Sequence, residues 1–173
     1  MSDAITFGEN DVITLPAFGK GTSLKIEMSS IRTAERRIIE AKNVSPVTYS
    51  ELEHVFNESY RDLKRHLSAI GYQLALAEKA LAEAKADVIL GSYAEFMVGK
   101  PKYQDNADLR QAYLTKDPAY SAAQDRIAQL KALESNFDGK LKVMENVCRY
   151  MRKKMDIIIR SGIPTGQFYN TQK

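Results

Sequence analysis

FNESYRDLKRHLSAIGYQLALAEKALAEAKADV, residues 56–88, is the stretch that determines the fold. Its apolar residues recur at alternating spacings of four and three, which is the pattern of a heptad seam on one face of an α-helix. Gly71 is the interior residue that disfavours a helix. The seam consists of Phe56, Tyr60, Leu63, Leu67, Ile70, Leu74, Ala77, Leu81, Ala84 and Val88. The stretch therefore predicts one long amphipathic helix, over about 50–98.

A second seam follows a polar break that begins at Gly99. Asp117 and Pro118 form a helix start, because aspartate caps a helix and proline fits its first position. The seam then predicts a helix over about 118–161, with Glu134 as a polar interruption and Gly162 as a stop signal. A short helix is also expected at 107–114. The members of the second seam are Tyr120, Ala123, Ile127, Leu130, Phe137, Leu141, Met144, Cys148, Met151, Met155 and Ile158.

The first 30 residues have a different pattern. DVITLPAF at 11–18 and the alternating apolar residues of 24–28 predict short strands, separated by Gly-Lys-Gly at 19–21. FGKG lacks the spacing and the following helix of a phosphate-binding loop. Two short strands are only marginally stable alone. We therefore expect 1–30 to be an arm that can pair as a short β-hairpin and docks on the helices or on a neighbouring subunit.

The predicted fold is mainly α, with a domain of 31–173 after the arm. A short helix is expected over about 31–43, capped by Ser29 and Ser30, and the two long helices should form a helical hairpin or coiled coil. Apolar residues outside the strict seams widen the apolar faces, so we expect a homo-oligomer. The expected subunit interface comes from the second seam: Leu130, Phe137, Leu141, Met144, Met151, Met155 and Ile158.

Composition limits the class of protein. Hydrophobic residues make up 44% and charged residues 27%, which is typical of a folded chain. No apolar run reaches the roughly 18 residues of a membrane span, and MSDAITFGEN lacks the features of a signal peptide. The single cysteine, Cys148, cannot form an internal disulfide and fits a reducing cytoplasm.

No set of residues predicts catalysis or metal binding. His54 and His66 lie twelve residues apart on one predicted helix, too far to share a metal ion, and no cluster of other ligands accompanies them. Cys148 lies in the second seam and is interpreted as a small core residue. We therefore expect no enzyme and no cofactor.

Positive charge is concentrated at the C-terminal end. Residues 139–173 carry eight basic and two acidic groups, a net +6, whereas 51–98 carry five and eight, a net −3. Such a patch attracts phosphates, acidic proteins or anionic membranes, or it simply complements the helix dipole. Nearby Tyr150, Phe168 and Tyr169 could stack on unpaired bases. The basic residues are Lys140, Lys142, Arg149, Arg152, Lys153, Lys154 and Arg160, with smaller patches at 32–37 and 61–65.

Helical spacing selects three of these residues. Arg149, Lys153 and Arg160 share one helix face, whereas Arg152 is turned away from it. We expect these three to meet a nucleic-acid strand first, because a strand that follows the helix would run along one face.

The layout of the chain also resembles a known family. A short helix runs into AKNV at 41–44, an amphipathic helix ends at Gly-Ser-Tyr at 91–93, and the last helix ends in IIIRSGI at 157–163. With Tyr113-Leu114 and Asp117 between them, these segments resemble, over 31–163, the phage UvsY-type recombination mediators. Members of that family carry a lysine and an arginine near the end of the first long helix that serve DNA binding. Lys85 matches the lysine, but Ala86 or Asp87 stands at the second position.

The resemblance implies a ring-like homo-oligomer built through the C-terminal helix. It also implies three partners: single-stranded DNA, a recombinase and a single-strand-binding protein. We therefore expect a recombination mediator that binds single-stranded nucleic acid. The alternative is a structural or adaptor coiled coil, such as a virion component or a partner-binding inhibitor, whose basic end meets protein.

Overall fold

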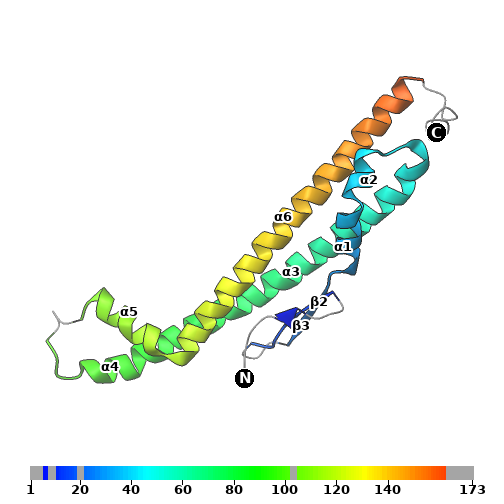
Figure 1. Ribbon diagram of the computed structural model, residues 1–173. Coiled ribbons are helices and arrows are strands. Elements are labelled where there is room, and N and C mark those ends of the chain that lie inside the picture. The colour runs from blue at the N-terminus through cyan, green and yellow to red at the C-terminus, as the bar shows by residue number, and fades with distance from the viewer. Residues whose placement is uncertain (1–5, 8–10, 19–21, 102–104, 163–173) are drawn as a thin grey trace. The chain divides into compact units, whose positions relative to one another are not determined.

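The computed structural model describes residues 6–7, 11–18, 22–101 and 105–162, and it is mainly helical, as predicted. Figure 1 shows two long helices, four shorter ones and a small sheet near the N-terminus. In chain order the elements are β1 (Thr6–Phe7), β2 (Val12–Leu15), β3 (Leu24–Glu27), α1 (Ser29–Arg36), α2 (Ile38–Lys42), α3 (Pro46–Leu90), α4 (Ser92–Met97), α5 (Ala107–Lys116) and α6 (Pro118–Arg160).

The described residues form two compact units, and each long helix contributes to both. The first unit contains 15–18, 22–24, 69–101 and 105–134, and the second contains 6–7, 11–14, 25–68 and 135–162. Within each unit, one half of α3 runs antiparallel to one half of α6 (Figure 1). The division thus crosses both long helices.

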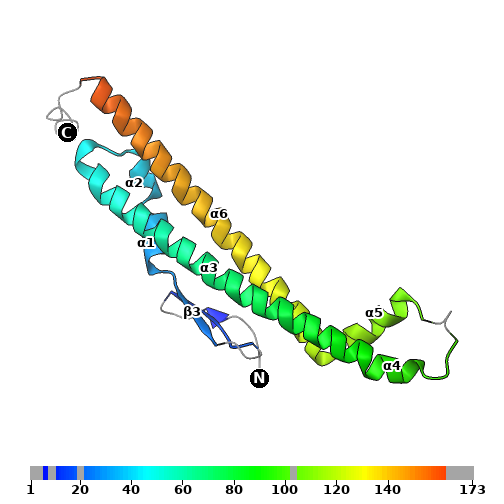
Figure 2. The ribbon, with the colours of Figure 1, turned by 180° about the vertical axis from the view of Figure 1, so that it is seen from behind.

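Apolar side chains of α3 and α6 form the centre of the second unit. Figure 2 shows α1 and α2 alongside this part of the long helices, where they cover one side of it. The side chains that are buried here are Phe56, Leu63, Phe137, Met144 and Met151 from the long helices, with Ile31, Ala34 and Ala41 from α1 and α2.

The first unit is closed by α4 and α5, which follow a break in the predicted helix at Gly91. A β-carbon at Gly91 would lie 2.7 Å from the carbonyl oxygen of Asp87, so the close backbone approach needs glycine. The hydroxyl of Tyr93 donates to Asp105 at 2.6 Å, and the hydrogen bonds from Arg110 and Tyr93 lower the pKa of Asp105 to about 2. One cluster of buried residues in this unit consists of Ala84, Val88, Tyr93, Leu114 and Tyr120.

The N-terminal strands form a small sheet in the order β1-β2-β3. β1 and β2 pair antiparallel, with Thr6 opposite Thr14. The backbone N–H of Met28, just after β3, donates to the carbonyl of Asp11 at 2.7 Å. The predicted strands are confirmed at β2 and β3, and the predicted turn at 19–21 lies outside the described residues.

The predicted bounds of the last helix are confirmed. Asp117 Oδ1 accepts a hydrogen bond from the backbone N–H of Tyr120 at 2.8 Å, so aspartate caps the helix and Pro118 opens it. Gly162 has a φ of 63°, a conformation that favours glycine, two residues after the helix ends at Arg160.

Other predicted bounds are wrong. α3 begins at Pro46 rather than near residue 50, because Ser45 caps its first turn and proline needs no N–H partner there. The helix predicted at 31–43 consists of α1 and α2, which are separated at Arg37. The predicted serine caps lie inside α1, where Ser30 donates to Asp62 at 2.7 Å instead.

The predicted seam of α3 is buried at six positions and shifted by one residue at three others. The predicted members that are buried are Phe56, Leu63, Ile70, Ala77, Ala84 and Val88. The predicted members that are only half-buried are Tyr60, Leu67, Leu74 and Leu81. In place of the first three of these, the structure buries their preceding neighbours Ser59, His66 and Gln73.

Contacts with the N-terminal segment explain this shift at His66 and Gln73. His66 Nε2 lies 3.1 Å from the carbonyl oxygen of Glu27 in the second unit. Gln73 Nε2 donates to the carbonyl oxygen of Thr22 at 3.4 Å in the first unit. Backbone carbonyls thus provide the partners that buried polar side chains require. A heptad pattern of apolar residues alone does not reveal these partners.

The seam of α6 is confirmed at most positions. Ile127 and Glu134 are half-buried, whereas the preceding residues, Arg126 and Leu133, are buried. Arg126 Nη2 donates to the carbonyl oxygen of Pro16 at 2.8 Å. In the first unit, a long polar side chain of α6 therefore also reaches the N-terminal segment.

The residues predicted for a subunit interface lie in the core of the single chain. Leu130 belongs to the first unit and the others to the second, and the chain's own helices cover them. The single chain therefore buries these residues without a second subunit. The buried residues are Leu130, Phe137, Leu141, Met144, Met151 and Met155, and the half-buried one is Ile158.

The environment of His66 predicts that acid destabilises the protein. Burial is the main cause that lowers the pKa of His66 from its ordinary value of 6.5, and the Arg65 charge adds to the effect. Below about pH 6.5 the unfolded chain therefore takes up a proton that the folded chain does not. As the pH is lowered further, the free energy of unfolding decreases by at most about 1.4 kcal/mol per pH unit. The free energy of unfolding, measured in urea between pH 7.5 and 5, should show this decline.

Two variants isolate the contribution of this residue. His66→Gln keeps an N–H donor near Glu27 but does not titrate, so its stability should vary less with pH over that range. His54→Gln, at an exposed position of the same helix, should keep the decline. An equal pH dependence in wild type and His66→Gln would show that this histidine is not the group responsible.

Candidate nucleic-acid interface

The structure places seven of the eight predicted nucleic-acid-binding residues on the C-terminal half of α6, within the second unit. Lys85 is the exception, because it lies on α3 in the first unit, where it is exposed. The seven residues are Lys140, Lys142, Arg149, Arg152, Lys153, Lys154 and Arg160.

Four of these seven share one exposed face of the helix. Successive residues of an α-helix are turned by about 100°, so Lys142, Arg149, Lys153 and Arg160 fall within roughly 40° of one another. All four are exposed. Along the same helix, Met144 and Met151 point into the core. We call these four residues the cationic face.

Three members of the cationic face have no carboxylate partner. Within the described part of the chain, Arg149, Lys153 and Arg160 form no ion pair, although ion pairs occur at neighbouring positions. Lys142 lies 2.7 Å from Asp138, one turn earlier, and this contact raises the pKa of Lys142. Among the members of the cationic face, the three residues selected by helical spacing are therefore those that no carboxylate of the described residues pairs with.

The remaining predicted residues hold α6 against its neighbours. Arg152 Nε lies 3.5 Å from Glu53 of α3, and a hydrogen bond with Tyr49 is the main cause that raises the pKa of Arg152. Lys140 pairs with Glu35 of α1. These contacts within the chain give Arg152 and Lys140 a structural role.

Lys154 points away from the cationic face. Its ammonium donates to the carbonyl oxygen of Lys42 at 2.7 Å, at the C-terminal end of α2. The carbonyls at a helix C-terminus carry partial negative charge, so this position suits a cation.

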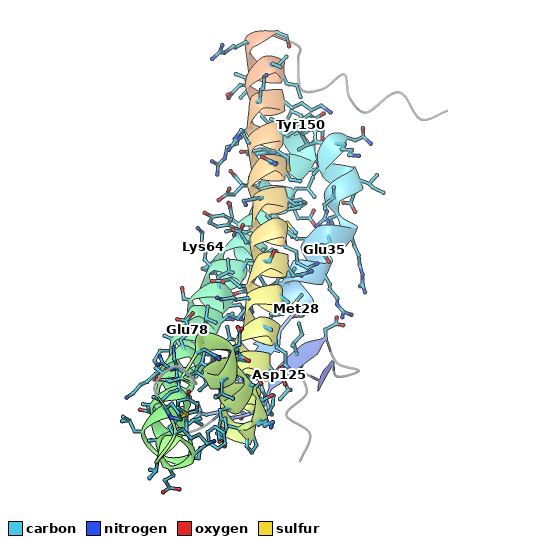
Figure 3. All side chains as sticks on the ribbon, turned by 90° about the vertical axis from the view of Figure 1, so that its left-hand side faces the viewer. Met28, Glu35, Lys64, Glu78, Asp125 and Tyr150 are labelled. Atoms are coloured by element: carbon cyan, nitrogen blue, oxygen red, sulfur yellow. The ribbon has the colours of Figure 1, made fainter. Side chains whose placement is uncertain are left out.

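A shallow groove of about 540 Å³ borders the cationic face, between α3 and α6. Tyr60 and Asn57 line it from α3, and the hydroxyl of Tyr60 donates to Glu145 at 3.2 Å. The ammonium of Lys64 lies 5.5 Å from the centre of the Tyr60 ring, and Figure 3 shows Lys64 on the α3 side of α6. The complete lining is Asn57, Tyr60, Glu145, Cys148, Arg149, Arg152, Lys153 and Asp156.

The groove combines charges of both signs. Glu145 and Asp156 would repel a phosphate in the groove, whereas Arg149 and Lys153 attract one toward the outer face. A polyanion is therefore best accommodated along the outer face of α6. The groove itself suits uncharged parts of a ligand, which could contact the Tyr60 ring and the Asn57 amide.

The sequence pattern did not identify the α3 wall of this groove. The heptad pattern places Tyr60 in the apolar seam, but the one-residue shift of that seam turns it toward the groove. The sequence does contain an indication of this shift, because the polar residues Ser59, His66 and Gln73 recur every seven residues. Polar residues that recur at this spacing, each next to an apolar seam residue, indicate that the helix has contacts on a second side as well.

The predicted aromatic residues do not extend the cationic face. The hydroxyl of Tyr150 donates to the carbonyl oxygen of Lys42 at 3.3 Å. Figure 3 shows Tyr150 on the side of α6 that meets α2, across from Lys64. Phe168 and Tyr169 lie outside the described residues.

Within the described ranges, groups of three or more histidine, cysteine, aspartate or glutamate side chains that could hold a metal ion do not occur. No helix in these ranges combines the length and apolar character required to cross a membrane.

Comparison with known proteins provides no relative. The chain matches no protein-family model, no curated protein and no solved structure.

Cys148 borders the groove but should react slowly. It is buried, and desolvation is the main cause that raises the pKa of its thiol, so little of the reactive thiolate forms at neutral pH. Alkylation followed by mass spectrometry should be at least roughly tenfold slower in the native protein than in urea. A matched control is Cys148→Ser with Asn146→Cys, which places the single thiol at an exposed position and should react rapidly without urea. Equal native rates for the two proteins would mean that Cys148 is accessible.

Proposed function

We propose that this protein binds single-stranded nucleic acid along the cationic face of α6 and acts as a homo-oligomeric mediator that loads a recombinase onto the strand. The observation that carries the proposal is the position of Arg149, Lys153 and Arg160. They share one exposed helix face, and within the described residues no carboxylate pairs with them.

Electrostatics supports a polyanionic ligand. Lysine and arginine side chains that neutralise phosphates release condensed counterions, and this release drives association. The three side chains are available without breaking an existing ion pair. Along the helix axis they extend over about 16 Å, at 1.5 Å per residue, so a strand could contact all of them in one pass.

The groove beside the cationic face supports a single strand over a duplex. Unpaired bases expose ring faces and hydrogen-bonding edges, for which aromatic and amide side chains are suitable partners. Tyr60 and Asn57 provide both kinds of group next to Arg149 and Lys153. The bases would lie toward α3 while the phosphates follow α6.

The recombinase-loading part of the proposal depends on the layout resemblance to the UvsY-type mediators. A mediator must bind its strand while it also contacts other proteins. Lys85, which matches a DNA-binding lysine of that family, is exposed on α3 and remains a second candidate contact.

A structural or adaptor protein without nucleic-acid function is the second candidate. The exposed fractions of Val143, Tyr150 and Ile157 on α6 are 45%, 48% and 58%, which favours protein contacts along another side of this helix. Under this alternative, the cationic face would serve solubility alone.

Neutralising the cationic face should weaken binding in a salt-dependent way. The triple variant Arg149→Gln, Lys153→Gln, Arg160→Gln removes three phosphate contacts at about 0.7 units of slope each, so the plot of log K against log salt should flatten by about two units. Fluorescence anisotropy with an unstructured oligonucleotide at several salt concentrations measures this slope. Binding should weaken to a similar degree for all base compositions, and helix content should not change.

A matched control carries the same change of net charge elsewhere. Lys79→Gln, Lys116→Gln, Lys131→Gln alters three exposed lysines of the first unit and should keep the wild-type slope. Equal losses in both variants would indicate a general charge effect. No binding by the wild type at low salt would remove the proposal and leave the adaptor alternative.

A further inference from the structure

A second groove lies on the other side of α6, where α2 packs against it. Its volume is about 470 Å³, and Ile38 and Ala41 of α2 face Val143 and Val147 of α6 across it. Tyr150 closes one end, where its hydroxyl donates to the carbonyl oxygen of Lys42. In contrast to the groove beside Tyr60, the floor of this one is apolar.

The apolar surface continues beyond the groove as a stripe on α6. Val143, Val147, Tyr150 and Ile157 follow one another at spacings of four, three and seven, so they lie on one side of the helix. Val143, Tyr150 and Ile157 are each about half exposed, and Ile39 of α2 is exposed by 72%. The stripe extends over about 21 Å, which is the length of roughly four helical turns.

Basic residues lie along one margin of this stripe and within it. Arg149 and Lys153, two members of the cationic face, are turned by roughly 80–120° from Val143 and form that margin. Lys154 is turned by only about 20° and lies among the stripe residues, with its ammonium on the Lys42 carbonyl. A carbonyl partner leaves the positive charge of Lys154 uncompensated. Glu40, the carboxylate of α2, already pairs with Arg37.

The basic margin and Lys154 indicate what can cover the stripe. Two copies of the stripe packed face to face would bring like charges together, which disfavours self-association. A helix with an apolar face and acidic side chains beside it would meet the stripe, Lys154 and the basic margin. The groove beside α2 is concave and the stripe is about four helical turns long, which suits a helix better than a flat lipid surface.

We propose that the groove between α2 and α6, with the stripe that continues it, is a docking site for an acidic amphipathic helix of a partner protein. The apolar face of the partner would lie on Val143, Val147 and Tyr150, and its carboxylates would meet the charges of Arg149, Lys153 and Lys154. The proposal is independent of nucleic-acid binding, since a protein that binds no oligonucleotide could still bind such a helix.

Three synthetic peptides of about 20 residues test the proposal, with side-chain staples that hold them helical because short helices are marginal in water. The first has a leucine face flanked by glutamates, the second has lysines in place of the glutamates, and the third has the composition of the first in an order without an apolar face. Fluorescence anisotropy with the full-length protein measures binding. The first peptide should bind saturably and at least tenfold more tightly than the others.

Variants locate the site. Val143→Glu, at a half-exposed position that tolerates a polar side chain, should weaken binding of the acidic peptide at least tenfold. Tyr72→Glu introduces the same charge at an exposed residue of α3 in the first unit and should leave binding unchanged. Circular dichroism of both variants verifies that helix content is preserved.

Several results would overturn the proposal. One is similar binding of the acidic and basic peptides, and another is binding of none of the three. Dissociation of an oligomer by Val143→Glu, measured by analytical ultracentrifugation, would assign the stripe to a second copy of this chain. Binding to phosphatidylserine vesicles that Val143→Glu abolishes, without peptide binding, would assign it to a membrane surface.

Discussion

Hydrogen bonds between buried polar side chains of the long helices and backbone carbonyls of the N-terminal segment are the constraint on which the arrangement depends. His66 contacts the carbonyl of Glu27 in the second unit, and Gln73 and Arg126 donate to carbonyls of the segment in the first unit. A buried polar group left without a partner costs about 1–3 kcal/mol. The long helices therefore need the N-terminal segment beside them. Without it, His66, Gln73 and Arg126 would be buried without these hydrogen-bond partners.

This constraint also determines which sides of α6 remain available in the second unit. The chain leaves β3 at Glu27, continues directly into α1 and places α2 against α6 near Tyr150. α3 packs on another side, where Tyr60 and Glu145 meet. Between these neighbours the cationic face with Arg149 and Lys153 stays exposed, and the apolar stripe lies next to it. One helix thus presents a surface suited to phosphates and another suited to a partner helix.

The sequence predicted the long helices because their apolar periodicity is strong and local. The start of α6 was also predictable, since Asp117 and Pro118 act on adjacent residues, and so was the cationic face, because helical spacing places Arg149 and Lys153 together. The register of α3 was not predictable in the same way: His66 and Gln73 look like solvent-facing residues until the N-terminal segment lies beside them. Likewise, the roles of Lys140 and Lys154 depend on α1 and α2, to which no short-range pattern connects them.

Lysine footprinting with an oligonucleotide tests the central claim most directly, because Lys153 and Lys154 are adjacent in sequence but lie on different sides of α6. Lys153 belongs to the cationic face, and Lys154 contacts the Lys42 carbonyl. Acetylation would be measured at each site by mass spectrometry, with and without saturating single-stranded oligonucleotide. If the strand follows the cationic face, the oligonucleotide should slow acetylation of Lys153 much more than that of Lys154. Equal protection of the two lysines, or protection at Lys85 with none at Lys153, would contradict the assignment of the cationic face as the binding surface.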